Sequence, residues 1–239
     1  MRAASGVWVA VPLKRMDRGK ERLSDLLSAN ERRRLVEAMA RDVLQALFGV
    51  PVAAEHILLV SDDPVVAALA TECGVRCFAP PPARNDPLNE DLAEAARYVI
   101  ANGAHDLLIV HADLPLAGPA QLRALIEDHR ERHGRRVTLV PDRAGEGTNC
   151  LLCTPPDAVA FRFGQDSRRR HLAACREGGV DCVEHRCEAL GADVDHPQDF
   201  AELVQASQST QNVCGANTRA LLREIGAAAI LERRGSRRA

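Results

Sequence analysis

The sequence predicts an α/β protein with a mostly parallel, mixed sheet flanked by helices. Short apolar runs have the length of buried strands, helical patterns separate them, and glycine or proline marks many of the changes between the two. The expected strands occupy residues 7–11, 56–61, 75–79, 107–110, 136–141, 150–154 and 180–185. Strands that alternate with helices in this way are typical of a doubly wound sheet.

Capping and terminating residues predict where the helices begin and end. Ser28 and Glu31 have the spacing of a capping box, and Pro197 suits a first helical turn. Asn89 and Ser167 are expected to cap two further helices. The helices should cover residues 28–49, 63–73, 89–103, 118–134, 167–178, 197–203 and 216–232. We expect one domain over residues 1–206 and a partly helical extension over residues 207–239.

Length and charge exclude several classes of protein. The 239 residues carry 31 Lys and Arg against 33 Asp and Glu, so a net charge of −2 favours neither nucleic acid nor an anionic membrane as a partner. No apolar run reaches the roughly 20 residues that cross a bilayer, and no segment resembles a signal peptide. We therefore expect a cytoplasmic protein with free thiols. The Cys150-x-x-Cys153 pair lies in a strand pattern without a second pair, which favours a structural role over a zinc or redox site.

Three carboxylates are candidates for a metal site. Asp113 follows the apolar run 107–110, at the edge where ligands bind in open α/β sheets. Asp193 and Asp195 lie two residues apart in an extended segment, so their side chains should point to the same side. Mg²⁺ prefers carboxylate oxygens together with phosphate oxygens, and these acids would suit it. Capping of turns is the competing interpretation for all three.

A loop rich in cations follows the first strand. Lys14, Lys20 and Arg22 lie close together in it, where lysine can neutralise a triphosphate and arginine can bind it in bidentate fashion. The chain contains neither a G-x-x-x-x-G-K-[ST] loop nor a G-x-G-x-x-G motif, so it is not a P-loop protein.

Two short elements in the second half suit a small anion. Gly147-Thr148-Asn149 and Gly164-x-x-Ser167 combine glycines, which allow close approach of backbone N–H groups, with hydroxyl donors. Ordinary helix capping explains Ser167 equally well. His111 and His171 are expected to have packing or hydrogen-bonding roles, although acid–base roles are the alternative.

Five motifs together resemble the guanylyltransferases of coenzyme F-420 biosynthesis. In order along the chain they are Val11-Pro12-Leu13-Lys14 with Lys20-x-Arg22-Leu23, Ala112-Asp113-Leu114-Pro115-Leu116, Gly147-Thr148-Asn149, Phe161-x-Phe163-Gly164-x-x-Ser167-x-x-x-His171 and Asp193-Val194-Asp195-x-Pro197-x-Asp199. The resemblance covers roughly residues 7 to 205. Proteins of that family join GTP to 2-phospho-L-lactate, phosphoenolpyruvate or 3-phospho-D-glycerate.

The resemblance implies a nucleotidyltransferase fold, similar to that of A-type glycosyltransferases, and a set of site residues. It implies Mg²⁺ ligands at Asp113, Asp193 and Asp195. Contacts to the phospho-acid would fall on Thr148, Gly164 and Ser167. Contacts to the nucleotide would fall on Pro12, Lys14, Lys20 and Asn89, with Arg22 beside the phosphates. Pro87-Leu88-Asn89 departs from the Gly-Leu-Asn that is usual in the family, which bears on the role of Asn89.

The expected reaction is transfer of GMP from GTP to phosphoenolpyruvate or 3-phospho-D-glycerate, ahead of 2-phospho-L-lactate, with release of pyrophosphate. Lys14, Lys20, Arg22 and Asp113 would be the catalytic residues. The expected partners are GTP and the phospho-acid, with a homodimer and a downstream transferase that takes the unstable product as further candidates. The alternatives are a molybdenum-cofactor or sugar-phosphate nucleotidyltransferase, and a regulatory protein that binds nucleotide without catalysis.

Overall fold

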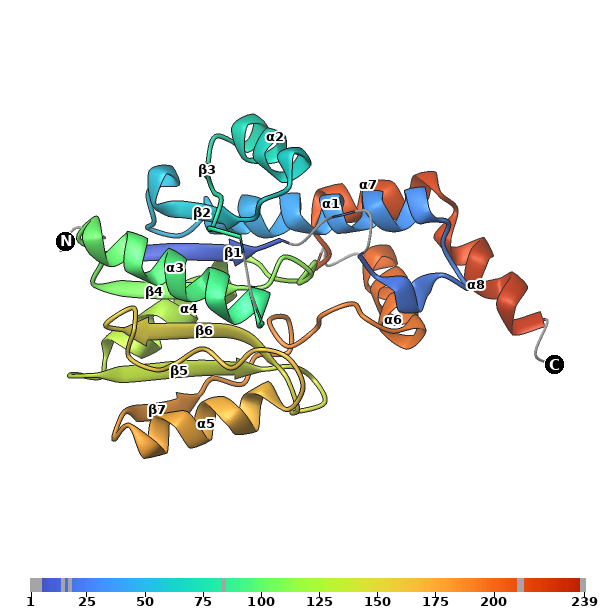
Figure 1. The fold of residues 1–239 in the computed structure, drawn as a ribbon. Coiled ribbons are helices and arrows are strands. Elements are labelled where there is room, and N and C mark those ends of the chain that lie inside the picture. The colour runs from blue at the N-terminus through green and yellow to red at the C-terminus, as the bar shows by residue number, and fades with distance from the viewer. Residues whose placement is uncertain (1–5, 14–15, 17–18, 83–84, 210–212, 237–239) are drawn as a thin grey trace.

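A seven-stranded sheet forms the centre of the computed structural model, which describes residues 6–13, 16, 19–82, 85–209 and 213–236 (Figure 1). The strand order is β3-β2-β1-β4-β6-β5-β7. The strands are β1 Val7–Pro12, β2 Ile57–Val60, β3 Arg76–Phe78, β4 Asp106–Val110, β5 Arg136–Pro141, β6 Thr148–Thr154 and β7 Asp181–Glu184. β6 is antiparallel to β4 and β5, whereas the other pairs are parallel. The expected mostly parallel α/β sheet is confirmed.

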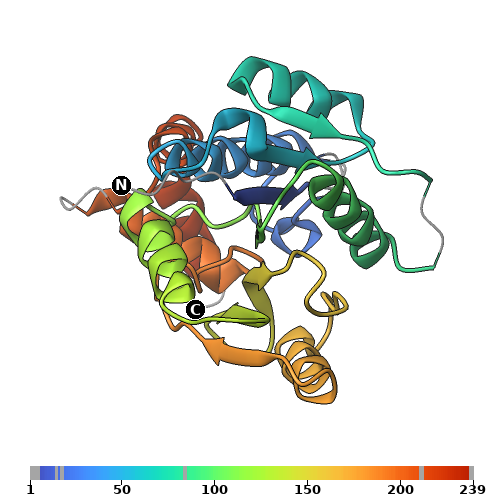
Figure 2. The same cartoon turned by 90° about the vertical axis from the view of Figure 1, so that its left-hand side faces the viewer.

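Helices cover both faces of the sheet (Figure 2). They are α1 Ala29–Leu47, α2 Pro64–Cys73, α3 Pro87–Ala101, α4 Pro119–Arg130, α5 Ser167–Glu177, α6 Pro197–Gln208, α7 Ala216–Glu224 and α8 Ala227–Ser236. Apolar residues of α1, α2 and α4 share one core with the sheet, and those of α3 and α5 share the other. Within the described ranges, no helix combines the length and the apolar character that a membrane span needs.

Several predicted boundaries shift in the structure. The capping box of Ser28 and Glu31 is present as expected. Asn89, expected to cap a helix, lies inside the first turn of α3, which begins at Pro87. Ser167, also expected as a cap, is the first residue of α5, with Asp166 before it. The single C-terminal helical pattern forms two helices, because the chain turns at Gly226 with φ of 64°.

The strand order places a crevice at the carboxyl edge of the sheet. β1 and β4 are parallel neighbours, and the chain continues from them towards opposite ends of the sheet. Ligands in open α/β sheets bind where the strand order reverses in this way. Because β6 is antiparallel, its first residues lie at the same edge, and the His111 N–H donates to the Asn149 carbonyl at 3.1 Å.

The C-terminal helices pack against α1 and α6 in a third core. The buried carboxylate of Asp42 on α1 accepts the backbone N–H groups of Asn217 (2.9 Å) and Thr218 (2.8 Å) at the start of α7. A Cβ at Gly215 would lie 2.2 Å from the Asp42 carboxyl carbon, so only glycine fits there. The expected domain boundary at residue 206 stays a prediction, but the start of α7 is hydrogen-bonded to α1 through Asp42.

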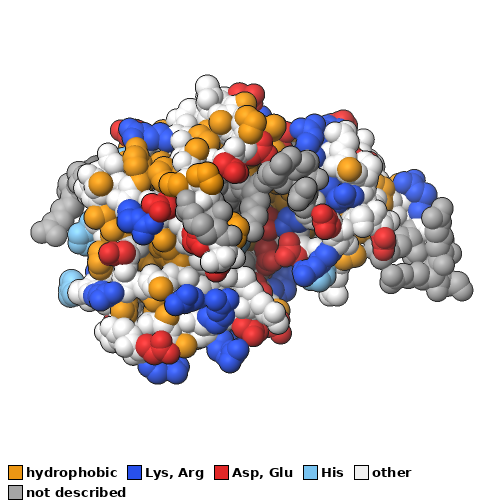
Figure 3. Space-filling view, viewed as in Figure 1, with side chains coloured by type: hydrophobic (Ala, Val, Ile, Leu, Met, Phe, Trp, Pro, Cys, Tyr) orange, Lys and Arg blue, Asp and Glu red, His pale blue; other side chains and the backbone are white. Residues whose placement is uncertain are grey.

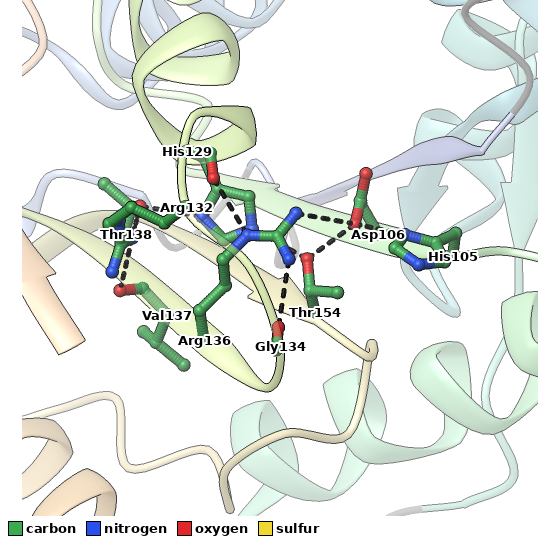
Figure 4. Close-up of polar contacts among 9 residues, drawn as sticks. All are labelled: His105, Asp106, His129, Arg132, Gly134, Arg136, Val137, Thr138 and Thr154. Atoms are coloured by element: carbon green, nitrogen blue, oxygen red, sulfur yellow. Dashed lines mark hydrogen bonds and ion pairs between the residues drawn. The ribbon is translucent and has the colours of Figure 1, made fainter. Parts of the chain in front are cut away.

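A buried polar network lies at the opposite edge of the sheet, where β4 and β5 begin and β6 ends (Figure 4). His129 of α4 contacts Thr138 through Nδ1 and Thr154 through Nε2, each at 2.7 Å. Thr154 donates to the Asp106 carboxylate, so it must accept from Nε2–H of His129. Arg132 donates to the Thr138 oxygen at 2.6 Å, and the Thr138 hydroxyl can still donate its own hydrogen to Nδ1. The network therefore accommodates His129 as a neutral imidazole.

The pKa of His129 agrees with a neutral imidazole. Burial lowers the pKa of His129 to about 3, and the nearby charge of Arg136 adds to the effect. In the unfolded chain the same imidazole titrates near its ordinary pKa of about 6.5. The contribution of His129 to stability is therefore complete above about pH 6.5 and is lost as the pH falls below it.

Replacing His129 by glutamine should reduce the acid sensitivity of the fold. Between about pH 6 and about pH 5 the wild-type protein should lose about 1 kcal/mol more unfolding free energy than His129→Gln, because the variant has no imidazole to protonate on unfolding. Urea unfolding at each pH measures this difference. Identical pH profiles for the two proteins would contradict the assignment of a neutral His129.

Candidate functional site

Lys20 joins two acids from distant parts of the chain at the carboxyl edge of the sheet. Its Nζ lies 2.5 Å from Asp113 Oδ2 and 2.7 Å from Asp195 Oδ1. The Lys20 side chain is 7% exposed, against 23% for Asp113 and 45% for Asp195. The expected convergence of Asp113, Asp195 and the basic loop is therefore present in the structure.

Each member of this cluster is positioned by a local backbone feature. Lys20 has φ of 58° and begins a short 3-10 turn, Glu21–Leu23. Asp113 lies three residues after the end of β4. The N–H groups of Asp195 (3.0 Å) and His196 (2.6 Å) donate to Asp199 Oδ2 in the first turn of α6. Asp193 and Asp195 thus lie in the loop between β7 and α6.

Lys20 and Asp113 stabilise each other's charges. Burial alone would lower the pKa of Lys20, but the charges of Asp113 and Asp195 raise it above its ordinary value. Burial alone would raise the pKa of Asp113, but Lys20, together with the smaller effects of His111 and a backbone hydrogen bond, more than offsets this and the pKa is lowered. Asp113 is therefore ionised at neutral pH.

Asp193 is the third predicted acid, and it is not one of the two acids that Lys20 contacts. Asn149 Nδ2 donates to its Oδ1 at 3.1 Å and to the Leu190 carbonyl at 3.1 Å. Burial raises the pKa of Asp193 to about 6, the hydrogen bond from Asn149 opposes this shift, and the charges of Asp113 and Asp195 add to it. The three predicted acids are thus close enough to influence one another.

The acids offer the oxygen ligands that a hard cation prefers, although they do not surround a common point. Asp113 Oδ1 is buried, and it has no hydrogen-bond partner in the part of the chain that the structure describes. Among those residues, no three His, Cys, Asp or Glu side chains stand close enough together to hold a metal ion. The Lys20 ammonium lies instead between Asp113 and Asp195. The unpaired oxygen and the carboxylate groups are donors of the kind that Mg²⁺ prefers.

A cavity of about 780 Å³ opens beside the cluster. Lys20, Asp113 and Asp195 line it, as does Pro12, a predicted nucleotide contact. Its apolar lining includes Pro80, Pro81, Pro82, Pro87 and Leu88. Figure 3 shows acidic side chains gathered in a hollow on this side of the molecule, with cationic side chains next to them. The volume lies within the range of small-molecule sites.

The three residues predicted to bind the phospho-acid lie at the same edge. Thr148 begins β6 and Ser167 begins α5, and their side chains are buried. Gly164 has φ of 107°, which favours glycine, and its carbonyl accepts the Ser167 N–H at 3.1 Å. Thr148 contacts the buried His171, whose pKa burial lowers to about 3, with the charge of Arg170 adding to the effect.

The remaining predicted nucleotide residues differ in their placement. Asn89 Nδ2 donates to the Phe163 carbonyl (3.1 Å), and Asn89 Oδ1 accepts the Phe163 N–H (2.8 Å), so its amide fastens the loop before α5 to α3. Arg22 is 65% exposed and contacts His196 Nε2 at 3.0 Å and Asp195 Oδ2 at 4.0 Å. Lys14 lies outside the described residues. A nucleotide role for Asn89 stays a prediction.

Sequence reasoning missed three residues that shape this edge. Asn149 holds Asp193, Asp199 holds the loop of Asp195, and Asp62 lines the cavity. Asn149 and Asp199 were visible as members of the motifs. Asp62 follows β2 with no pattern of its own, so only the packing of β2 beside β1 reveals its position.

Comparison with known proteins supports the family resemblance that the motifs indicate. Residues 7–238 match the protein family described as "Guanylyl transferase CofC like", a match that continues through the C-terminal helices. The phosphoenolpyruvate guanylyltransferase of Nocardia farcinica is 39% identical over 222 residues, which cover 92% of each chain. A protein of the same name from Sphaerobacter thermophilus is 37% identical over 193 residues, covering 81% of this chain and 90% of the relative.

A solved structure shares the fold. A nucleotide-diphospho-sugar transferase from Desulfovibrio desulfuricans G20 superposes with a TM-score of 0.76 at 18% identity, covering 95% of this chain and 97% of that one. The expected nucleotidyltransferase fold is therefore confirmed.

Removing the Lys20 charge should destabilise the fold. Lys20→Met leaves Asp113 without its counter-charge and Asp195, among the described residues, with only Arg22 at 4.0 Å. The unfolding free energy at neutral pH should therefore fall by roughly 2 kcal/mol, a modest loss because Asp195 is 45% exposed to solvent. Adding Asp113→Asn should restore part of the loss, because a neutral amide needs no counter-charge. Arg97→Met, which removes an exposed cation, is the control and should change little. Equal losses in the single and double variants would contradict the coupling.

Proposed function

This chain belongs to the CofC-like guanylyl transferase family, and from this premise we propose that it transfers GMP from GTP to phosphoenolpyruvate, with release of pyrophosphate, in coenzyme F-420 biosynthesis. The chain is a nucleotidyltransferase of the guanylyltransferase type. The names of the relatives at 39% and 37% identity favour phosphoenolpyruvate as the acceptor over 3-phospho-D-glycerate and 2-phospho-L-lactate.

The observation that carries the proposal is the cluster of Lys20, Asp113 and Asp195 beside the cavity of about 780 Å³. It combines a buried cation, which can neutralise phosphate oxygens, with carboxylates that can ligate a divalent ion. The cluster lies at the carboxyl edge beside β1 and β4, where nucleotides bind in related sheets. This combination supports a reaction at a nucleoside triphosphate.

In the proposed reaction a phosphate oxygen of phosphoenolpyruvate attacks the α-phosphorus of GTP in line. A new bond forms between that oxygen and the α-phosphorus, the bond to the β-phosphate oxygen breaks, and pyrophosphate leaves with its electron pair. The attacking phosphate is already an anion, so no side chain has to remove a proton. The protein contributes positioning and charge neutralisation.

We assign these contributions to separate groups. Lys20 and Arg22 would neutralise the triphosphate and the departing pyrophosphate, together with Lys14. Pro12 would contact the nucleotide along the cavity wall. Thr148, Gly164 and Ser167 would bind the phospho-acid, and Asp193 accepts a hydrogen bond from Asn149, the residue after Thr148.

Asp113, Asp195 and the neighbouring Asp193 would offer carboxylate oxygens to Mg²⁺, although in this structure the three side chains do not surround a common point. When bound, Mg²⁺ would supply further positive charge to the phosphate oxygens. Asp113 has the strongest case because its Oδ1 is buried and lacks a hydrogen-bond partner among the described residues. Its low pKa keeps it available as an anion at neutral pH.

The substitution Asp113→Asn should abolish most of the activity without unfolding the protein. Pyrophosphate release from GTP, phosphoenolpyruvate and Mg²⁺ should fall by at least about a hundredfold, because a neutral amide is a poor ligand for a hard cation. The matched control is Asp181→Asn on β7, which removes an exposed acid that pairs with Arg132 and should keep wild-type activity. Wild-type turnover by Asp113→Asn would refute the role given to this acid.

A competition among acceptors tests the substrate choice. With the three phospho-acids present in equal amounts, phosphoenolpyruvate should be consumed first. The acids differ by a double bond, a methyl or a hydroxyl group, and a hydrogen-bonding site can separate such groups by orders of magnitude. Mass spectrometry of the GMP adducts measures the ratio. A dominant adduct of 3-phospho-D-glycerate would instead make that acid the substrate of the same reaction.

A further inference from the structure

We infer that His171 is a positioning residue that turns the Thr148 hydroxyl into a donor aimed at the phospho-acid, an inference that rests on the proposed function. His171 does not touch the substrate in this account. It acts through Thr148, by deciding in which direction the Thr148 hydrogen can point.

The first step is the assignment of the His171 tautomer. The backbone N–H of Arg162 donates to His171 Nε2 at 2.9 Å, so Nε2 carries no hydrogen. A doubly protonated ring would bring two hydrogens together at that contact. The ring is fully buried, and its lowered pKa keeps it neutral near pH 7. The single ring hydrogen must therefore be on Nδ1.

The second step concerns the hydroxyl group. His171 Nδ1 lies 3.1 Å from Thr148 Oγ1, and Nδ1–H must be the donor in this contact. The backbone of Ser167 also forms a hydrogen bond with the His171 ring. The Thr148 oxygen is thus an acceptor towards His171, and its own hydrogen has to point elsewhere. No second hydrogen bond of this hydroxyl is formed with the residues described in the structure.

The third step is the rigidity of the arrangement. The Phe163 ring packs edge-on against His171 with centroids 4.8 Å apart, and it contacts the His111 ring at 5.2 Å. The backbone of Phe163 is in turn held by Asn89 through two hydrogen bonds. These contacts fix the plane of the His171 ring, and therefore the direction of its Nδ1–H.

The consequence is a site for the oxygens of an anionic acceptor. The Thr148 hydroxyl is buried, so little water competes for its hydrogen. A phosphate or carboxylate oxygen accepts such a hydrogen and offers none in return. With its acceptor side held by Nδ1–H, Thr148 favours an anionic oxygen over a group that must donate.

Two substitutions distinguish the roles of the two ring nitrogen atoms of His171. Glutamine places its amide near the Nε2 position, so His171→Gln keeps a partner for the Arg162 N–H and loses the donor to Thr148. Asparagine places its amide near Nδ1, so His171→Asn keeps the donor to Thr148 and loses the other contact. In initial-rate assays His171→Gln should raise KM for phosphoenolpyruvate about tenfold, whereas His171→Asn should stay within about threefold. KM for GTP should not change in either variant.

A double variant tests whether His171 acts through Thr148. Thr148→Val removes the hydroxyl at similar volume and should raise KM for phosphoenolpyruvate by at least about tenfold. Adding His171→Gln to Thr148→Val should cause no further increase, because the hydroxyl that His171 orients is absent. Multiplied effects, or an equal rise in KM for GTP, would show a general structural role and overturn the inference.

A measurement without turnover separates this inference from the proposed function. Long-range ¹H–¹⁵N spectra of the folded protein report the tautomer of each histidine, and the His171 signals are identified by their loss in His171→Gln. We expect a protonated Nδ1 and an unprotonated Nε2 near neutral pH. A hydrogen on Nε2, or a doubly protonated ring, would overturn the inference, whereas failure of the wild-type protein to release pyrophosphate would refute the proposed function.

Discussion

The ion-paired cluster of Lys20, Asp113 and Asp195 is the interaction on which the rest of the site depends. Burial alone would raise the pKa of Asp113, and the Lys20 ammonium, 2.5 Å from Asp113 and 2.7 Å from Asp195, opposes this and helps to keep Asp113 ionised. The cluster connects the loop after β1, the loop after β4 and the loop before α6. Three segments that are far apart in the sequence are thereby held around one end of the cavity.

The antiparallel strand β6 places Thr148 and Asn149, at its start, at the same edge of the sheet as the acids. An all-parallel sheet would place the start of that strand at the opposite edge, away from Asp113. Because β6 runs against β4, Thr148 and Asn149 lie beside the end of β4. Asn149 donates to Asp193, and the adjacent Thr148 contacts His171, so the first residues of β6 contact both one of the predicted acids and the histidine beside the predicted phospho-acid residues. A reaction that joins two phosphorylated molecules needs such a two-part arrangement.

Much of this organisation could be predicted from the sequence, because it depends on local patterns. The apolar runs indicated the strands, and the motifs around Asp113 and Asp195 indicated the acids that Lys20 brings together. The contacts of Asn89 and His171 could not be predicted. Both residues act on partners from other elements, Asn89 on the Phe163 backbone and His171 on Thr148, and only tertiary packing reveals such pairs. The start of α3 was also misplaced, because Asn89 resembles a cap but lies inside the first turn. Ser167 is the first residue of α5, as the expected range has it, but Asp166 and not Ser167 precedes the helix as its cap.

The most direct test of the account is to identify the product by ³¹P nuclear magnetic resonance. The purified protein is incubated with GTP, phosphoenolpyruvate and Mg²⁺, and the spectrum is followed over time. The account predicts a pair of mutually coupled phosphorus signals, from a phosphoanhydride between GMP and the phospho-acid, growing in step with pyrophosphate. Formation of GDP and free phosphate without the coupled pair, or no change in the spectrum, would contradict it.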